Sequence, residues 1–133
     1  MLLRSGRTRS LGTGGGGAIS PVRPEMAVTR RGAVWLVDLD NPSNPRQLAV
    51  VREGVGSLSW SPDGNHLVGV SSRGSYPDRY SFITVISRED GSVRYMAPSV
   101  YLDQAPEWSP DGSHIAFRRR LTSDHLEIGR AHV

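Results

Sequence analysis

The chain of 133 residues contains no cysteine and no lysine, and its 16 basic residues are all arginine. Without cysteine, a disulfide framework and metal–thiolate sites are excluded. No run of about 20 apolar residues exists, so the sequence predicts no membrane-spanning helix and no membrane partner. A secretory signal needs an apolar stretch of about 7–15 residues, and the N-terminal region offers only Leu2 and Leu3. The compartment, periplasm or cytoplasm, therefore stays open.

Several chemical signatures are also missing. No Gly-x-Ser-x-Gly elbow occurs, and no Ser, His and Asp set has triad spacing, so no catalytic residue is assigned. Residues 12–17 satisfy G-x-G-x-x-G by composition, but a nucleotide site needs a strand before that loop and a helix after it. Residues 18–21 indicate a strand and a turn instead, which favours a flexible linker and no cofactor. The run Arg118, Arg119 and Arg120 is interpreted as a solvated strand end, with an anionic ligand as the alternative and no nucleic acid as partner.

A repeat is the strongest positive signal. Trp-Ser-Pro-Asp-Gly occurs at residues 60–64 and again at residues 108–112, which is an offset of 48 positions. A fainter copy begins at Ser20-Pro21, where Val22 and Arg23 replace Asp-Gly, and an apolar strand follows in the same register. Self-similarity with a period of roughly 20–50 residues is typical of repeat architectures.

The tetrapeptide Ser-Pro-Asp-Gly has a turn chemistry of its own. Proline presets φ for the second turn position, aspartate bonds the backbone two residues on, and glycine supplies a positive φ. Because an apolar run precedes and follows each copy, each copy is predicted to be the turn of a β-hairpin. The Asp-x-x-His pairs Asp63/His66 and Asp111/His114 are therefore assigned to turn and strand roles rather than to a metal site, because turn chemistry repeats and a catalytic site usually does not.

Short β-branched and aromatic runs fill the space between the turns, which predicts four strands per unit. The inner runs are apolar at nearly consecutive positions, as expected for a sheet that is covered on both faces. These features predict an all-β fold: a partial β-propeller with two four-stranded antiparallel blades and the first hairpin of a third. The tryptophans Trp35, Trp60 and Trp108 are expected to pack between neighbouring sheets.

The repeat resembles the propeller repeats of the TolB type, over about residues 17–121. Such repeats also form the N-terminal domain of prolyl oligopeptidase and dipeptidyl-peptidase IV-like serine peptidases. Residues 32–39, 81–83, 94–100 and 108–117 resemble the bacterial peptidase branch most. This resemblance implies a peptide substrate and a C-terminal α/β-hydrolase domain that would carry the catalytic triad. No substrate-binding residue of the family matches a position here.

The chain is short for a propeller, which typically needs about four to eight blades. We expect a flexible or non-native N-terminus at 1–16, blades at about 17–50 and 56–97, and a truncated third blade at 104–126. Residues 127–133 resemble a translated sequencing adapter and are expected to fall outside the repeat. The chain is accordingly interpreted as a fragment of a longer protein.

Residues 72–80 form a long insert between two inner strands. Propeller loops carry binding functions, so Tyr76, Arg79 and Tyr80 are the predicted functional surface, with a plain exposed loop as the alternative. Two functions remain open. The first is the propeller of a serine peptidase, which would gate and bind peptide for the hydrolase domain and the remaining blades. The second is a non-enzymatic TolB-like protein-interaction module.

Overall fold

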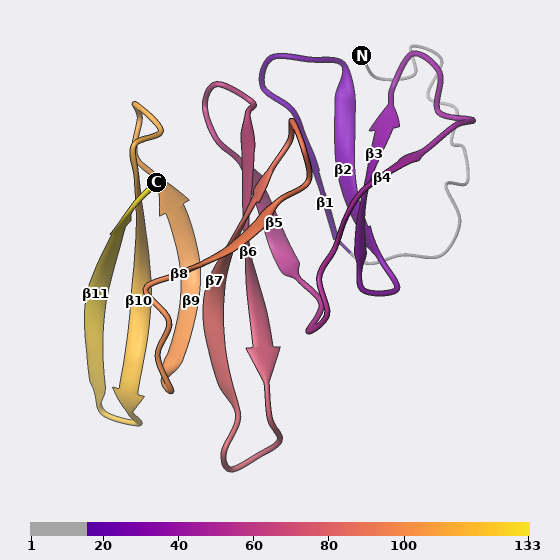
Figure 1. The fold of residues 1–133 in the computed structure, drawn as a ribbon. Coiled ribbons are helices and arrows are strands. Elements are labelled where there is room, and N and C mark those ends of the chain that lie inside the picture. Colours follow the sequence, from indigo (N-terminus) through magenta and orange to yellow (C-terminus); the bar gives the residue numbers. More distant parts are fainter. Residues whose placement is uncertain (1–15) are drawn as a thin grey trace.

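The computed structural model describes residues 16–133, and every regular element in that part of the chain is a β-strand (Figure 1). The expected N-terminal linker, including the glycines before Gly16, lies outside the described residues. The first four strands pair antiparallel in chain order and form blade 1. These strands are β1 (Gly17–Ile19), β2 (Glu25–Arg30), β3 (Ala33–Asp38) and β4 (Arg46–Val50).

Blade 2 repeats the same antiparallel meander. Its strand β7 is buried from residue 81 to residue 86. Neighbouring blades cover both of its faces, as the consecutive apolar residues of this segment predicted. The blade consists of β5 (Gly56–Trp60), β6 (His66–Arg73), β7 (Tyr80–Ser87) and β8 (Val93–Met96).

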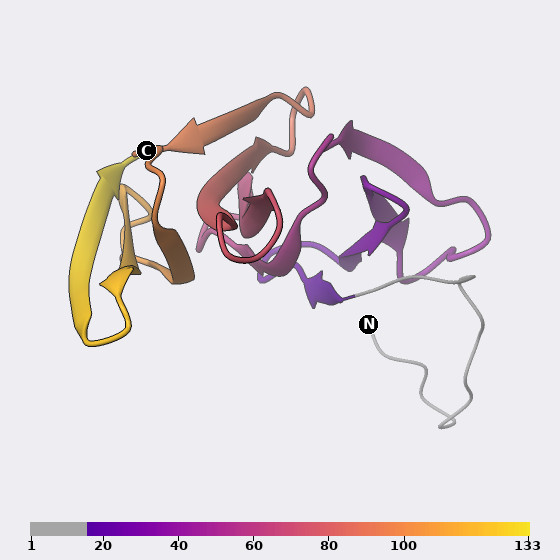
Figure 2. The same ribbon diagram turned by 90° about the horizontal axis from the view of Figure 1, so that it is seen from below.

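Blade 3 contains three strands: β9 (Leu102–Trp108), β10 (His114–Thr122) and β11 (His125–His132). A single parallel pairing of Ser81 with Leu102 joins β9 to β7. Seen from below, the three blades stand side by side along an arc (Figure 2). The all-β partial propeller is thus confirmed, and no helix long and apolar enough to cross a membrane occurs among the described residues.

The third unit differs from the predicted single hairpin. Residues 127–133, which the sequence sets apart from the repeat, lie mostly in β11, and Ala131 pairs with Ile115 of β10. Gly129 stands opposite Phe117, whose ring occupies the place where a Cβ would lie. That these residues are encoded by a sequencing adapter rather than by the gene stays a prediction, which sequencing of the locus would test.

The two Ser-Pro-Asp-Gly turns have the same hydrogen bonds. The Ser61 hydroxyl donates to Asp63 Oδ1 at 2.7 Å and accepts from the His66 amide at 3.0 Å. The equivalent distances around Ser109 are also 2.7 and 3.0 Å, to Asp111 and from His114. Both turn glycines have φ of +72°, which a residue with a Cβ adopts only under strain. The turn role of the aspartates is therefore confirmed.

The fainter first turn keeps part of this arrangement. The Ser20 amide donates to the Glu25 carbonyl at 2.9 Å, as the Ser61 amide does to the carbonyl of His66. Because Asp-Gly is absent, the Ser20 hydroxyl accepts from the amides of Val22 and Arg23 at 3.2 Å. The turn therefore closes in the predicted register without the aspartate.

The core lies between blades. One cluster joins blade 1 to blade 2 and includes Trp60, and a second joins blade 2 to blade 3 with Trp108 packed against it. The Trp60 indole donates to the Ala18 carbonyl at 2.9 Å, and the Trp108 indole donates to the Ser59 carbonyl at 3.2 Å. The predicted packing of these two residues is confirmed. Trp35 is half-buried in β3 and belongs to neither cluster.

Candidate functional site

The β6–β7 hairpin carries the predicted functional loop and reaches beyond the other hairpins at the lower edge of Figure 1. Strands β6 and β7 have 8 residues each, whereas β2 and β3 have 6. Tyr80 lines a pocket on one side of this hairpin, whereas Tyr76 and Arg79 line a different pocket. The structure therefore does not bring the three predicted residues together in one site.

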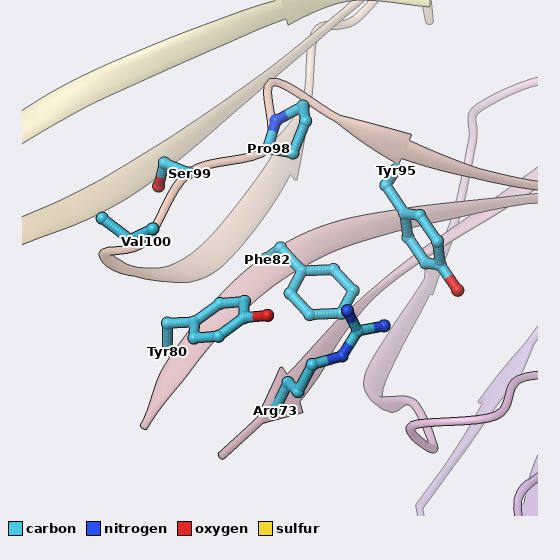
Figure 3. A pocket seen from close by; sticks show the side chains of 7 residues that line it. All are labelled: Arg73, Tyr80, Phe82, Tyr95, Pro98, Ser99 and Val100. Atoms are coloured by element: carbon cyan, nitrogen blue, oxygen red, sulfur yellow. The ribbon is translucent and has the colours of Figure 1, made fainter. Parts of the chain in front are cut away.

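The first of these pockets, which we call the aromatic pocket, has a volume of about 440 Å³ (Figure 3). Tyr80 and Phe82 alternate along β7, so both side chains project from the same face of the strand. The Phe82 ring lies 6.0 Å from the Tyr80 ring and 5.0 Å from the Tyr95 ring of β8, the latter edge to face. The lining residues are Arg73, Tyr80, Phe82, Tyr95, Pro98, Ser99 and Val100.

Glu53 holds the polar side of the aromatic pocket in place. Its carboxylate pairs with the Arg73 guanidinium and accepts a hydrogen bond from the Tyr95 hydroxyl at 3.1 Å. The bond from Arg73 lowers the pKa of Glu53, while burial and the bond to Glu53 raise the pKa of Tyr95. The Arg73 guanidinium carbon lies 5.9 Å from the centre of the Phe82 ring, within cation–π range. These contacts fix Arg73 at the rim with its charge partly neutralised.

The second pocket, which we call the inner pocket, has a volume of about 510 Å³ and lies between blades 2 and 3. A β-bulge shifts the β5–β6 register between Gly56 and Ser59, and Ser57 adopts a φ of +55°. The lining consists of Gly56, Ser57, Val70, Ser72, Tyr76, Pro77, Arg79, Ser81, Leu102 and Gln104. The bulge and Gln104 had no signal in the sequence.

Sequence reasoning also missed Glu53, Arg73, Phe82 and Tyr95. The alternation of Tyr80 and Phe82 along one strand could have identified two aromatic residues on one face. Nothing local could have added Tyr95 or Glu53, because they come from other segments and meet Arg73 only in the folded blade.

The Arg118–Arg119–Arg120 run is only partly solvated. The Arg119 guanidinium makes two hydrogen bonds, of 2.8 and 2.9 Å, to the carboxylate of Asp103, whose side chain is fully buried. It also donates to the Ala97 carbonyl at 2.7 Å. The expectation of a solvated strand end is therefore wrong for Arg119, because a buried carboxylate must be paired.

The repeated histidines have packing roles. The His66 ring lies 6.4 Å from the Trp108 ring, and the His114 ring lies 4.6 Å from His132, edge to face. The strand-opening position predicted for both histidines is confirmed. Within residues 16–133, no three His, Asp or Glu side chains are grouped so that they could hold a metal ion.

No family model matches the chain, and no curated protein matches its sequence. Solved structures do match it. A tricorn protease structure matches 91% of this chain with a TM-score of 0.67 at 15% identity. An oligogalacturonate lyase in complex with manganese matches 88% with a TM-score of 0.72 at 18% identity, and TolB from Acinetobacter baumannii matches 87% with a TM-score of 0.57 at 22% identity.

These matches establish a β-propeller fold of the TolB-like kind. The chain spans 13% of the tricorn protease chain, 38% of the lyase chain and 27% of the TolB chain. At such identities the likeness concerns the fold, because one fold hosts many unrelated functions.

Proposed function

We propose that the chain is the propeller part of a serine peptidase of the prolyl oligopeptidase type. In that protein it would admit and bind peptide for an α/β-hydrolase domain in another part of the polypeptide. Two observations support the proposal: residues 81–83 and 94–98, which resemble the bacterial peptidase branch, and the structural likeness to a tricorn protease.

The aromatic pocket is the observation that carries the proposal. Aromatic-lined grooves accept extended, proline-containing peptides, because a flat apolar ring packs against the aromatic faces. Phe82 and Tyr95 supply two rings at an edge-to-face angle of 86°. Arg73, whose side chain is 55% exposed, still offers donors to a peptide carbonyl. A peptide ligand therefore finds both apolar and polar contacts there.

The decisive experiment is to recover the downstream reading frame from the genomic locus. We expect a Gly-x-Ser-x-Gly elbow followed by Asp and then His, and the longer protein should cleave a dipeptidyl chromogenic substrate. The chain of 133 residues alone should leave that substrate intact. A stop codon soon after the last blade, or turnover by the short chain, would contradict the proposal.

A second experiment addresses the pocket directly. Proline-containing peptides should bind the chain, and Tyr95→Ala should weaken that binding by about 1–3 kcal/mol because a stacking surface is lost. Arg94→Gln is the matched control: Arg94 is the exposed neighbour of Tyr95 and does not line the pocket. Equal affinities of the two variants would exclude the pocket as the peptide site.

The non-enzymatic alternative is a TolB-like interaction module, which the likeness to TolB favours. The two functions make different predictions for the longer protein. A module would have no hydrolase domain, would cleave no peptide, and would bind a folded protein partner rather than short peptides.

A further inference from the structure

Arg79 is the one charged residue that lines the inner pocket. Its guanidinium makes no ion pair with any of residues 16–133, and it donates one long hydrogen bond, of 3.4 Å, to the Ser72 hydroxyl. Arg73, on the other side of the hairpin, is by contrast paired with Glu53. We propose that the inner pocket binds the carboxylate group of a small organic acid, and that Arg79 pairs with it.

Further donors line the same pocket as Arg79. Gln104 is half-buried, and within the described part of the chain its side-chain amide has no hydrogen-bond partner. Ser57 is exposed at the pocket edge, and its hydroxyl is likewise unbonded among these residues. The Ser81 hydroxyl is already used, because it donates to the Asp103 carbonyl at 2.7 Å. A ligand would therefore meet one guanidinium, one amide and the hydroxyls of Ser57, Ser72 and Tyr76, all with hydrogen-bonding capacity left.

A β-bulge borders the inner pocket, and an equivalent bulge occurs in the next repeat unit. Ser57 is left-handed at φ +55°, and Ala105 of β9 has the same conformation at φ +52°, 48 positions later. Non-glycine residues adopt this conformation at a cost of about 1 kcal/mol or more, and such positions cluster at ligand sites. The two bulges lie on β5 and β9, the first strands of blades 2 and 3, and both strands contribute lining residues.

The charge and shape of the lining select the ligand class. No Asp or Glu lines the inner pocket, so a cation has no partner there. A guanidinium matches a planar carboxylate through two parallel hydrogen bonds, and a single arginine suits one negative charge. Val70 and Leu102 add apolar surface, and about 510 Å³ accommodates the body of an acid larger than acetate. The inference stands independently of the peptidase proposal.

Calorimetric titration of the chain with matched pairs of probes tests the ligand class. N-acetylalanine and galacturonate should bind, whereas N-acetylalaninamide and galactose, which lack the carboxylate, should not. Tighter binding of N-acetylalanine would identify the ligand as a peptide C-terminus, and tighter binding of galacturonate would identify it as a sugar acid. Inorganic phosphate that binds as tightly as the better acid would overturn the carboxylate assignment, as would absence of binding by both acids.

Two substitutions test the residues. Arg79→Gln should weaken acid binding about tenfold, because a charge-assisted hydrogen bond is lost, and Gln104→Glu should weaken it by placing a negative charge in the pocket. Arg94→Gln removes an exposed arginine outside the pocket and should leave affinity unchanged. Circular dichroism verifies that each variant is folded. Equal affinities of the Arg79 and Arg94 variants would place the acid elsewhere and overturn the proposal.

Discussion

Trp60, between blades 1 and 2, is 7% exposed, whereas its repeat equivalent Trp108, between blades 2 and 3, is only partly buried. Each indole donates to a carbonyl of the preceding blade, so the contact itself is conserved within the chain. The two interfaces differ in what surrounds that contact. An apolar cluster joins each pair of blades. An ion pair between Glu25 and Arg88 also connects blades 1 and 2, whereas side-chain bonds to backbone carbonyls connect blades 2 and 3.

The polar connections arise where the repeat motif is weakest. Arg23, which stands in place of the turn glycine, donates to the Gly64 carbonyl at 2.9 Å in the next blade. Glu25, which stands in place of His66 and His114, accepts two hydrogen bonds from Arg88 at 2.6 and 2.9 Å. The unit whose turn lacks Asp-Gly is thus attached to its neighbour by side chains that the other units do not have at these positions.

The largest effect is expected from truncating the two tryptophans. Trp60→Ala should destabilise the chain by about 4 kcal/mol, because a nearly buried indole leaves a cavity and an unpaired carbonyl. Trp108→Ala should cost about half as much, since its ring is partly solvated already. Chemical denaturation followed by circular dichroism measures both values. Equal losses would mean that the two interfaces contribute equally.

The ion pairs provide the next comparison. Arg119→Met should cost about 3 kcal/mol, because it leaves the fully buried Asp103 carboxylate unpaired. Arg88→Met should cost less, about 1–2 kcal/mol, because the Glu25 side chain is 12% exposed and can regain some water, whereas that of Asp103 is fully buried. Adding Asp103→Asn to Arg119→Met should recover part of the loss. If the double variant is no more stable than Arg119→Met, the unpaired charge is not the cause.

Gly64 and Gly112 occupy the same position of the repeat but have different neighbours, so substituting each one shows the effect of those neighbours on stability. Gly64→Ala and Gly112→Ala impose the same strain at φ +72°. A Cβ at Gly64 would also overlap Val22 of blade 1, whereas at Gly112 the nearest atom is Pro62 Cδ at 3.6 Å. We expect losses of about 2 and about 1 kcal/mol in thermal or denaturant unfolding, from the extra overlap at Gly64. A larger loss at Gly112 would contradict the closer packing of the first interface.

The smallest expected effect is the part of the pH dependence of stability that comes from the two Ser-Pro-Asp-Gly turns. Hydrogen bonds from Ser61 and the Asn65 amide lower the pKa of Asp63, and those from Ser109 and Ser113 lower the pKa of Asp111. Because the pKa of each carboxyl is lower in the folded than in the unfolded state, its ionised form stabilises the fold above about pH 4. This stabilisation is lost as the pH falls through the folded-state pKa. The melting temperature of Asp63→Asn/Asp111→Asn should therefore depend less on pH between about 4 and 2. Parallel profiles for the variant and the parent chain would refute this.

Local sequence was informative wherever the interacting groups are close along the chain. The turn that starts at Ser61 closes within six residues, so its pattern predicts the hydrogen bonds, the hairpin and the packing position of Trp60. The site was less predictable. The sequence predicted one functional surface with Tyr80 and Arg79 together, but Tyr80 opens β7 and lines the aromatic pocket, whereas Arg79 precedes the strand and lines the inner pocket.

The sequence by itself therefore determined the repeat, the turns and the all-β blades, because each depends on conformational preferences of a few adjacent residues. The tertiary structure alone decided that Arg119 pairs with Asp103, that Glu53 fixes Arg73 and Tyr95, and that residues 127–133 extend blade 3. It also decided that bulged strands create a pocket around an unpaired Arg79. Each of these contacts joins different strands or linkers, and their meeting is set by the packing of blades rather than by any local pattern.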